Sequence, residues 1–185
     1  MIYCIMGPTA TGKTTIARKA ADELGLEVIV SYTSRPIRPR EIDGVDYHFV
    51  DNAYFDENAE DFIEMREYTV YDGSIWKYGF KKNSFKSKKD DYIAIVDPGG
   101  FEAFKEYFGE NHVMAILIES FQDELFTRLQ KRGDNPEEIK RRIADDIQRF
   151  AAFKRNNQNW KIVYNHFELD FAVIQTVKNI LGGCK

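Results

Sequence analysis

The architecture of this chain can be inferred from one stretch near its start, Gly7-Pro8-Thr9-Ala10-Thr11-Gly12-Lys13-Thr14, with Thr15 directly after it. The stretch matches the pattern G-x-x-x-x-G-K-[ST] at every fixed position. The apolar run 2–6 before it predicts a buried strand, and residues 14–24 after it predict a helix that ends at Gly25. A strand, such a loop and a helix, in this order, form a phosphate-binding loop.

A loop of this kind can bind a polyphosphate through its backbone. Successive N–H groups and the N-terminus of the helix form a nest for anionic oxygens. Lys13 can reach the outer phosphates, and the hydroxyl of Thr14 can take a coordination position on Mg²⁺. We therefore expect residues 7–15 to bind a nucleotide's phosphates, with Thr14 as a metal ligand. The alternative is a chance glycine turn that feeds a helix.

Length and composition are typical of one soluble globular domain. The chain has 185 residues, 43% of them hydrophobic and 30% charged, and its formal net charge is −4. This negative charge argues against nucleic acid or an anionic membrane as a partner. We expect a cytoplasmic protein, because no targeting segment precedes the first strand and no apolar run is long enough to span a bilayer. Its two cysteines are expected to be free thiols.

Strand-like and helix-like runs alternate along most of the chain. Strands are expected at 27–30, 92–96, 113–118 and 162–164, and helices at 100–108, 122–132, 137–155 and 168–181. In the long helix, Ile139, Ile143, Ile147 and Phe150 recur on one face, which we expect to be buried. Consecutive β-α units predict a three-layer α/β fold with a mainly parallel sheet. Ligands bind such sheets beyond the carboxyl ends of the strands.

Residues 32–80 interrupt this alternation. They are rich in Tyr, Arg, Asp and Gly and contain short strand-like runs at 47–50, 62–71 and 75–80. The turn at Asp72-Gly73 predicts that the last two runs form a hairpin. We therefore expect a small mixed-sheet insert at this point of the chain.

The insert begins with a second informative pattern. The positions in register with the acceptor segment S-x-T-T-R-x-P-R-x-G-E-x-x-G-x-D-Y-x-F-V are Ser31, Thr33, Arg35, Arg38, Glu41, Gly44, Asp46, Tyr47, Phe49 and Val50. On this segment and the phosphate-binding loop, the chain resembles the guanylate kinases. Ile37 and Arg40 replace the family's proline and glycine. The resemblance implies a P-loop NTPase fold and Mg²⁺-dependent transfer of a phosphoryl group from ATP to GMP.

Candidate ligands for the acceptor's phosphate lie in this segment. Arg35 and Arg38 are three residues apart, so two guanidinium forks can converge on one dianionic phosphate. Tyr47 can add a phenolic donor. The resemblance implies that these three residues hold the acceptor's phosphate, assisted by Tyr78. A solvated basic loop is the alternative.

The resemblance also implies that Ser31 and a glutamate of a Phe-Ile-Glu run bind the acceptor's base. A carboxylate can accept hydrogen bonds from both N1–H and the amino group of guanine. Glu64 ends such a run and is our candidate. Glu67 competes with it, because the stretch that follows is longer than is usual in the family. Phe80 replaces a residue that is usually polar and in contact with the base.

Further site residues are implied by likeness to the lid of the nucleoside monophosphate kinases. Arg128, Arg132 and Arg142 match arginines that close over the phosphates there. Phosphoryl transfer mainly needs positioning and neutralisation of charge, which guanidinium groups supply. The alternative is a surface of ion pairs between these arginines and nearby glutamates. We expect Arg141 to point away from the cleft.

Two residues at strand ends complete the set. Asp97 follows the strand 92–96, where an acid can lie near Mg²⁺ or the acceptor, although it could instead cap the following turn. The family's second acid, two residues earlier, is Ile95 here. Asn165 matches a residue near the donor's base.

The resemblance implies one guanylate-kinase-like domain over residues 1–185. Its core would comprise residues 1–31, 81–127 and 156–185, its acceptor-binding insert residues 32–80 and its lid residues 128–155. ATP and GMP would be the substrates. Two other functions stay open: a related enzyme that acts on another nucleotide or a phosphorylated pentose, and a non-catalytic module that binds phosphorylated proteins. The second typically lacks the loop's lysine, which is present here as Lys13.

Overall fold

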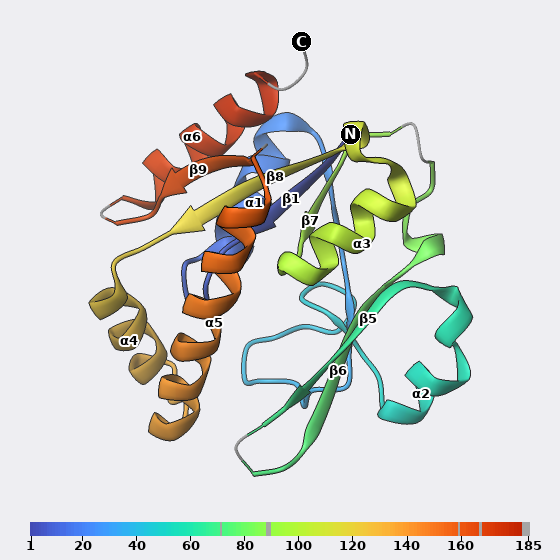
Figure 1. Ribbon diagram of the computed structural model, residues 1–185, viewed down its shortest axis with the longest axis vertical. Coiled ribbons are helices and arrows are strands. Elements are labelled where there is room, and N and C mark those ends of the chain that lie inside the picture. Colours follow the sequence, from blue (N-terminus) through green and yellow to red (C-terminus); the bar gives the residue numbers. More distant parts are fainter. Residues whose placement is uncertain (71, 88–89, 159, 167, 183–185) are drawn as a thin grey trace.

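The main sheet of the computed structural model has five strands in the order β2-β7-β1-β8-β9, and all neighbouring strands are parallel (Figure 1). The structure describes residues 1–70, 72–87, 90–158, 160–166 and 168–182. The strands are β1 (Ile2–Met6), β2 (Glu27–Ile29), β7 (Tyr92–Ile95), β8 (Val113–Glu119) and β9 (Trp160–Tyr164). The mainly parallel sheet predicted from the alternating pattern is confirmed.

The central strand β1 is buried along its whole length, because helices cover both faces of the sheet. Side chains alternate along the strand. Tyr3 and Ile5 pack in one cluster with Ile16 of α1 (Lys13–Leu24) and Val173 of α6 (Leu169–Gly182). This cluster therefore joins one face of the sheet to the layer formed by α1 and α6.

The opposite face of the sheet has a different, aromatic core. Cys4 and Met6 pack there with Phe104 of α3 (Pro98–Phe108) and Phe150 of α5 (Pro136–Asn156). Figure 1 shows α3 and α5 over this part of the sheet, with α4 (Gln122–Lys131) leading into α5. The three-layer α/β fold is thus confirmed.

The second sheet is small and mixed, as the sequence predicted. Its order is β4-β3-β6-β5, in which β3 and β4 are parallel and the other neighbours antiparallel. Its elements are β3 (Tyr32–Thr33), β4 (His48–Phe49), α2 (Asn52–Glu57), β5 (Phe62–Thr69) and β6 (Ile75–Lys81). Single 3₁₀ turns occupy Ala59–Asp61, Lys82–Ser84 and Glu110–His112. The hairpin β5–β6 is confirmed, whereas Tyr71, the expected end of its first run, lies outside the described residues.

One expectation for the long helix α5 is wrong. Ile139 and Phe150 are buried as predicted, but Ile147 is 55% exposed. At 3.6 residues per turn, the buried stripe centres on Ile139, Phe150 and Phe153, and Ile147 falls beyond its edge. Phe150 and Phe153 pack against the core of the main sheet, whereas the helix face that carries Ile147 is turned to solvent.

Cys4 is a free, buried thiol, and burial holds its pKa far above the ordinary range. Cys184 lies outside the described residues. No helix within the described ranges is both long enough and apolar enough to cross a membrane.

Gly7 is required at the end of β1, and substitution by alanine tests this. Its φ is +147°, and an added Cβ would lie 2.2 Å from the carbonyl oxygen of Ile118. We expect Gly7→Ala to lower the free energy of unfolding by about 3 kcal/mol or more. Urea denaturation measures this. Gly182→Ala is the matched control, because nothing lies within 4 Å of its added Cβ; equal losses in both variants would contradict the steric argument.

Candidate active site

A cavity of about 560 Å³ lies beyond the carboxyl ends of β1, β2 and β7, between the phosphate-binding loop, the mixed sheet and α5. Most of the predicted site residues line it. They are Gly7, Thr9, Ala10, Gly12, Lys13, Thr14, Thr15, Ser31, Arg35, Arg38, Tyr47, Tyr78, Asp97, Arg128, Arg132 and Arg142. The predicted residues Pro8, Thr11, Glu64 and Asn165 are absent from this lining.

The phosphate-binding loop is supported from beneath. The hydroxyl of Thr11 donates to the carbonyl of Pro8 at 2.9 Å. The amide of Asn165 donates to the carbonyl of Thr11 at 2.8 Å. An added Cβ at Gly12 would lie 2.7 Å from that same amide. Pro8, Thr11 and Asn165 therefore shape the loop, and the role of Asn165 shown here is support of the loop.

Lys13 folds back over the loop. Its ammonium donates to the carbonyls of Gly7 and Pro8 at 2.8 and 2.7 Å. Burial lowers the pKa of Lys13 to about 8; Asp146 opposes this shift and Arg132 adds to it. The charge of Lys13 is thus poised to change near neutral pH.

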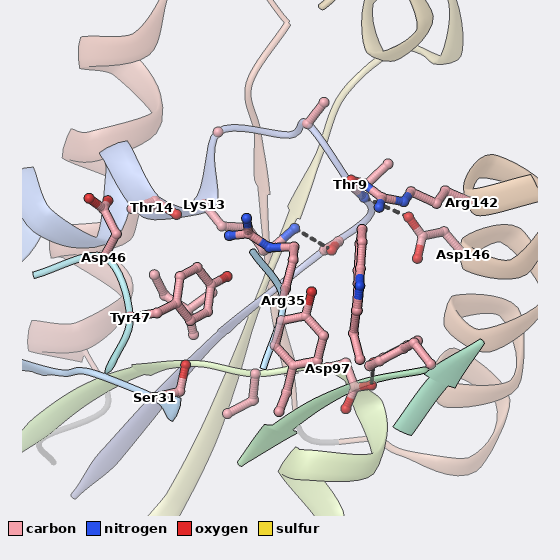
Figure 2. A pocket seen from close by; sticks show the side chains of 18 of the residues that line it. Thr9, Lys13, Thr14, Ser31, Arg35, Asp46, Tyr47, Asp97, Arg142 and Asp146 are labelled. Carbon is pink, nitrogen blue, oxygen red and sulfur yellow. Dashed lines mark hydrogen bonds between the residues drawn. The ribbon is translucent and has the colours of Figure 1, made fainter. Parts of the chain in front are cut away.

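A carboxylate of the long helix is bound to the loop. The N–H of Thr9 donates to Asp146 at 2.6 Å, and Figure 2 shows Asp146 and Arg142 projecting from α5 toward Thr9. Burial raises the pKa of Asp146, against the effects of this N–H and of Lys13. An amide of the nest therefore already binds an anionic oxygen.

The residues present suit a metal ion held mainly by a bound polyphosphate. Thr14 is exposed at the start of α1, with its side chain at the cavity. Asp97 is less suitable, because its carboxylate accepts hydrogen bonds from Gly100 N–H and Tyr68 Oη–H at 2.9 and 2.6 Å and pairs with Arg66. Within the described part of the chain, no three His, Cys, Asp or Glu side chains gather as a metal site.

Arg35 belongs to a buried cluster and not to a solvated basic loop. It is 3% exposed and donates to Glu41 and to the carbonyl of Pro36, both at 2.7 Å. Its guanidinium carbon lies 5.3 Å from the centre of the Tyr47 ring. Burial opposes the charge of Arg35, but Glu41 outweighs it, so the pKa of Arg35 is raised.

Arg38 is influenced by charged groups on two sides of the cavity. Its backbone N–H donates to Glu41 at 2.8 Å, and its side chain is half-buried. Burial lowers the pKa of Arg38, and repulsion from Arg35 and Arg132 lowers it further. Arginines of the β3–β4 connection and of the α4–α5 connection therefore lie within electrostatic reach of one another.

The arginines of α4 and α5 take different positions. Arg128 donates to the carbonyls of Ala10 and Asn165, both at 3.2 Å, which ties α4 to the phosphate-binding loop. Arg132 pairs with Asp134. Arg142 donates to Glu138 at 2.6 Å, and its guanidinium carbon lies 5.9 Å from the centre of the Trp76 ring. All three arginines line the cavity, as expected.

The expectation that Arg141 points away from the cleft is wrong. Arg141 lines the cavity and donates to both oxygens of Glu138, each at 2.8 Å. Glu138 is almost fully buried and also binds Arg142. One acid therefore holds two neighbouring arginines at the same wall.

The predicted base-binding acid lies behind an arginine. Glu64 accepts two hydrogen bonds from Arg66, at 2.7 and 3.0 Å, and Arg66 also pairs with Asp97. Burial raises the pKa of Glu64, which Arg66 only partly offsets. Arg66, and not Glu64, lines the cavity.

The two other residues that the sequence left open lie elsewhere. Glu67 is on the opposite face of β5, where its exposed side chain pairs with Lys77 at 3.4 Å. Phe80 is buried against Phe104 of α3, with 5.1 Å between ring centres. Neither residue lines the cavity.

Sequence reasoning missed several cavity residues, among them the charged residues Arg66, Asp146 and Arg149. The signals were present in the residue spacing. Arg66 follows Glu64 by two positions, which places both on one face of a strand. Asp146 and Arg149 follow Arg142 by four and seven positions, which places them along one face of a helix.

Comparison with known proteins agrees with this geometry. The family model described as guanylate kinase matches residues 1–181. The guanylate kinase of Zymomonas mobilis is 33% identical over 186 residues, covering 98% of this chain and 82% of its own. That of Hydrogenovibrio crunogenus is 31% identical over 183 residues, covering 95% and 85%.

The fold has a counterpart among solved structures. The crystal structure of guanylate kinase from Anaplasma phagocytophilum superimposes with a TM-score of 0.70 at 22% identity, and covers 100% of this chain and 87% of its own. At that identity, the likeness concerns the fold alone. Together with the match over residues 1–181, it leads to one conclusion: the chain belongs to the guanylate kinase family.

Proposed function

We propose that this protein transfers the γ-phosphoryl group of Mg-ATP directly to the phosphate of GMP, giving ADP and GDP. Membership of the guanylate kinase family supports this proposal. The cavity adds independent support, because it has an amide nest at one side and a pair of arginines, Arg35 and Arg38, at the other.

One observation carries the proposal: Arg132 lines the same cavity as Lys13 of the phosphate-binding loop and Arg38 of the β3–β4 connection. It contributes to the lowered pKa of Lys13 at the phosphate-binding loop. It also contributes to the lowered pKa of Arg38 in the acceptor cluster, which comprises Arg35, Arg38, Tyr47 and Tyr78. A transferred phosphoryl group must pass between two such sides, and a cation near both can neutralise its charge in transit.

The residues divide the work as follows in this proposal. The amides of residues 7–15 and Lys13 bind the triphosphate, while Arg35, Arg38, Tyr47 and Tyr78 hold the acceptor's phosphate. Arg132 and Arg142 face the group that moves. Arg128 positions α4 against the loop through the carbonyls of Ala10 and Asn165. Mg²⁺, when bound with ATP at Thr14, neutralises phosphate charge.

We further propose that the chain works as three parts of one domain. The core comprises residues 1–31, 81–127 and 156–185, the acceptor-binding insert residues 32–80 and the lid residues 128–155. In Figure 1, the α4–α5 pair and the β5–β6 hairpin project from the same end of the main sheet, which suits closure around a substrate. ATP and GMP are cytoplasmic metabolites, so we place the reaction in the cytoplasm.

A second candidate is a related enzyme that phosphorylates another acceptor. The observation that favours it is that Glu64, the acid expected to bind guanine's N–H groups, is already paired with Arg66. A non-catalytic module is disfavoured, because the phosphate-binding loop, Lys13 and Arg142 all line one cavity.

The first test is a coupled assay of ADP release with each nucleoside monophosphate. We expect turnover of GMP and dGMP. Lys13→Met should lower kcat about 100-fold to 1000-fold, because the variant lacks the ammonium group that neutralises charge on the phosphates. The melting temperature of the variant should stay close to that of the parent chain. Turnover of another acceptor with GMP and dGMP inert would reject the substrate proposed here.

The pH dependence of ATP binding tests the role of Lys13. Phosphate binds the ammonium form, which predominates below the pKa of about 8. Affinity for Mg-ATP should therefore be highest below pH 8 and weaken by up to about tenfold per pH unit above it. Calorimetric titration from pH 6.5 to 9.5 measures the effect. Lys13→Arg keeps its charge throughout, so the same slope in that variant would contradict the assignment.

Asp146 gives a further prediction. Its carboxylate occupies the N–H of Thr9 and adds negative charge beside Lys13, so a triphosphate must displace it. We expect Asp146→Ala to strengthen Mg-ATP binding at pH 7 by about tenfold. Asp145→Ala is the control, because Asp145 pairs with Arg149 at 3.1 Å and not with the loop. Weaker binding in Asp146→Ala would show that the carboxylate supports the bound state.

A further inference from the structure

One wall of the cavity, beside the acceptor cluster, is built from Arg66, Tyr68 and Asp97. Arg66 projects from β5, opposite Tyr78 of β6 in the hairpin register. Asp97 ends the connection from β7 and caps α3. The wall shares one cavity with Arg35 and Arg38, so a base whose phosphate is held by those two arginines would lie in the same cavity as Arg66.

The wall presents hydrogen-bond donors. A guanidinium carries five N–H groups. Arg66 uses its Nε and Nη2 on the two oxygens of Glu64, and its Nη1 on Asp97. Two N–H groups, one on each terminal nitrogen, have no partner among the residues that the structure describes. About a fifth of the side chain is exposed at the cavity.

The two acids are correspondingly unavailable. Glu64 is 6% exposed at its side chain and lies behind Arg66. Asp97 accepts from Tyr68, from Gly100 and from Arg149, the last at 3.4 Å, besides its pair with Arg66. The acidic groups therefore support Arg66, and do not offer their own oxygens to a ligand.

Arg66 is also held rigidly. Burial opposes its charge, but Glu64 and Asp97 outweigh burial and keep the pKa of Arg66 above its ordinary value. An added Cβ at Gly100 would lie 3.5 Å from the guanidinium carbon, so α3 packs closely against the group. A donor fixed from two sides loses little entropy when it binds a ligand.

We propose that Arg66 is the specificity-determining residue for the acceptor's base, and that it binds the O6/N7 edge of guanine. This inference rests on the proposed phosphorylation of GMP. Guanine offers two acceptors on that edge, O6 and N7, which match two guanidinium N–H groups. Adenine offers N7 and an amino donor, and a pyrimidine has no N7, so each matches the wall less well.

This mode of binding predicts an unusual pattern of substrates. The 2-amino group of guanine lies on the other edge and makes no contact with Arg66. Hypoxanthine keeps both O6 and N7, so inosine monophosphate should be accepted nearly as well as GMP. An acid that binds N1–H and the 2-amino group would instead discriminate strongly between these two nucleotides.

The test compares kcat/KM for GMP, inosine monophosphate and 7-deaza-GMP with the unmodified enzyme. We expect inosine monophosphate within about threefold of GMP, and 7-deaza-GMP lower by about tenfold or more, because one charged hydrogen bond is lost. Equal rates with GMP and 7-deaza-GMP, together with poor use of inosine monophosphate, would overturn the inference. GMP turnover in that same assay would leave the proposed function intact, whereas inert GMP would reject both.

Two variants locate the effect. Arg66→Lys keeps the charge but not the fork, so the ratio of kcat/KM between GMP and 7-deaza-GMP should fall toward one. Glu67→Gln, on the outer face of the same strand, should leave that ratio unchanged. Thermal melting checks that both variants fold. An unchanged ratio in folded Arg66→Lys would overturn the inference.

Discussion

Repulsion between cations around one cavity is the constraint on which this site depends. Burial lowers the pKa of both Lys13 and Arg38, and repulsion from Arg132 lowers both pKa values further. Acids paired with the arginines of the cavity stabilise such a concentration of positive charge. Glu41 holds Arg35, Asp134 holds Arg132 and Glu138 holds Arg142. These acids fix the orientation of the guanidinium groups. The positive charge that they do not neutralise is available to a phosphate.

The same logic explains the contact between α5 and the phosphate-binding loop. Without a nucleotide, the nest and Lys13 form a positive pocket, and Asp146 supplies the anion that such a pocket favours. Because Asp146 lies on the helix that also carries Arg142, this contact couples the position of the helix to the state of the loop. Under the proposed function, binding of a triphosphate would exchange the Asp146 carboxylate for a phosphate at this N–H group.

The sequence predicted the parts of this structure that local patterns determine. Near-continuous apolar runs such as 2–6 and 113–118 are typical of strands between two helical layers, and the Asp72-Gly73 turn predicts the hairpin. The predicted position of Ile147 was wrong, because periodicity gives the direction of a helix face but not the width of the layer that covers it. Most of the phosphate-binding loop and Arg35 were predicted correctly, because the residues that the motifs name also line the cavity.

The end of the cavity beside Arg66 could not be predicted from motif positions alone. Two carboxylates, Glu64 and Asp97, are brought close by packing of β5 against α3, and their charges must be compensated whether or not a ligand is bound. If ligand N–H groups were the only compensation, the empty site would carry two buried, unpaired acids at a cost of several kcal/mol. Arg66 supplies a permanent countercharge instead. A site stabilised in this way does not depend on a ligand for its charge balance, and it presents Arg66 to the cavity.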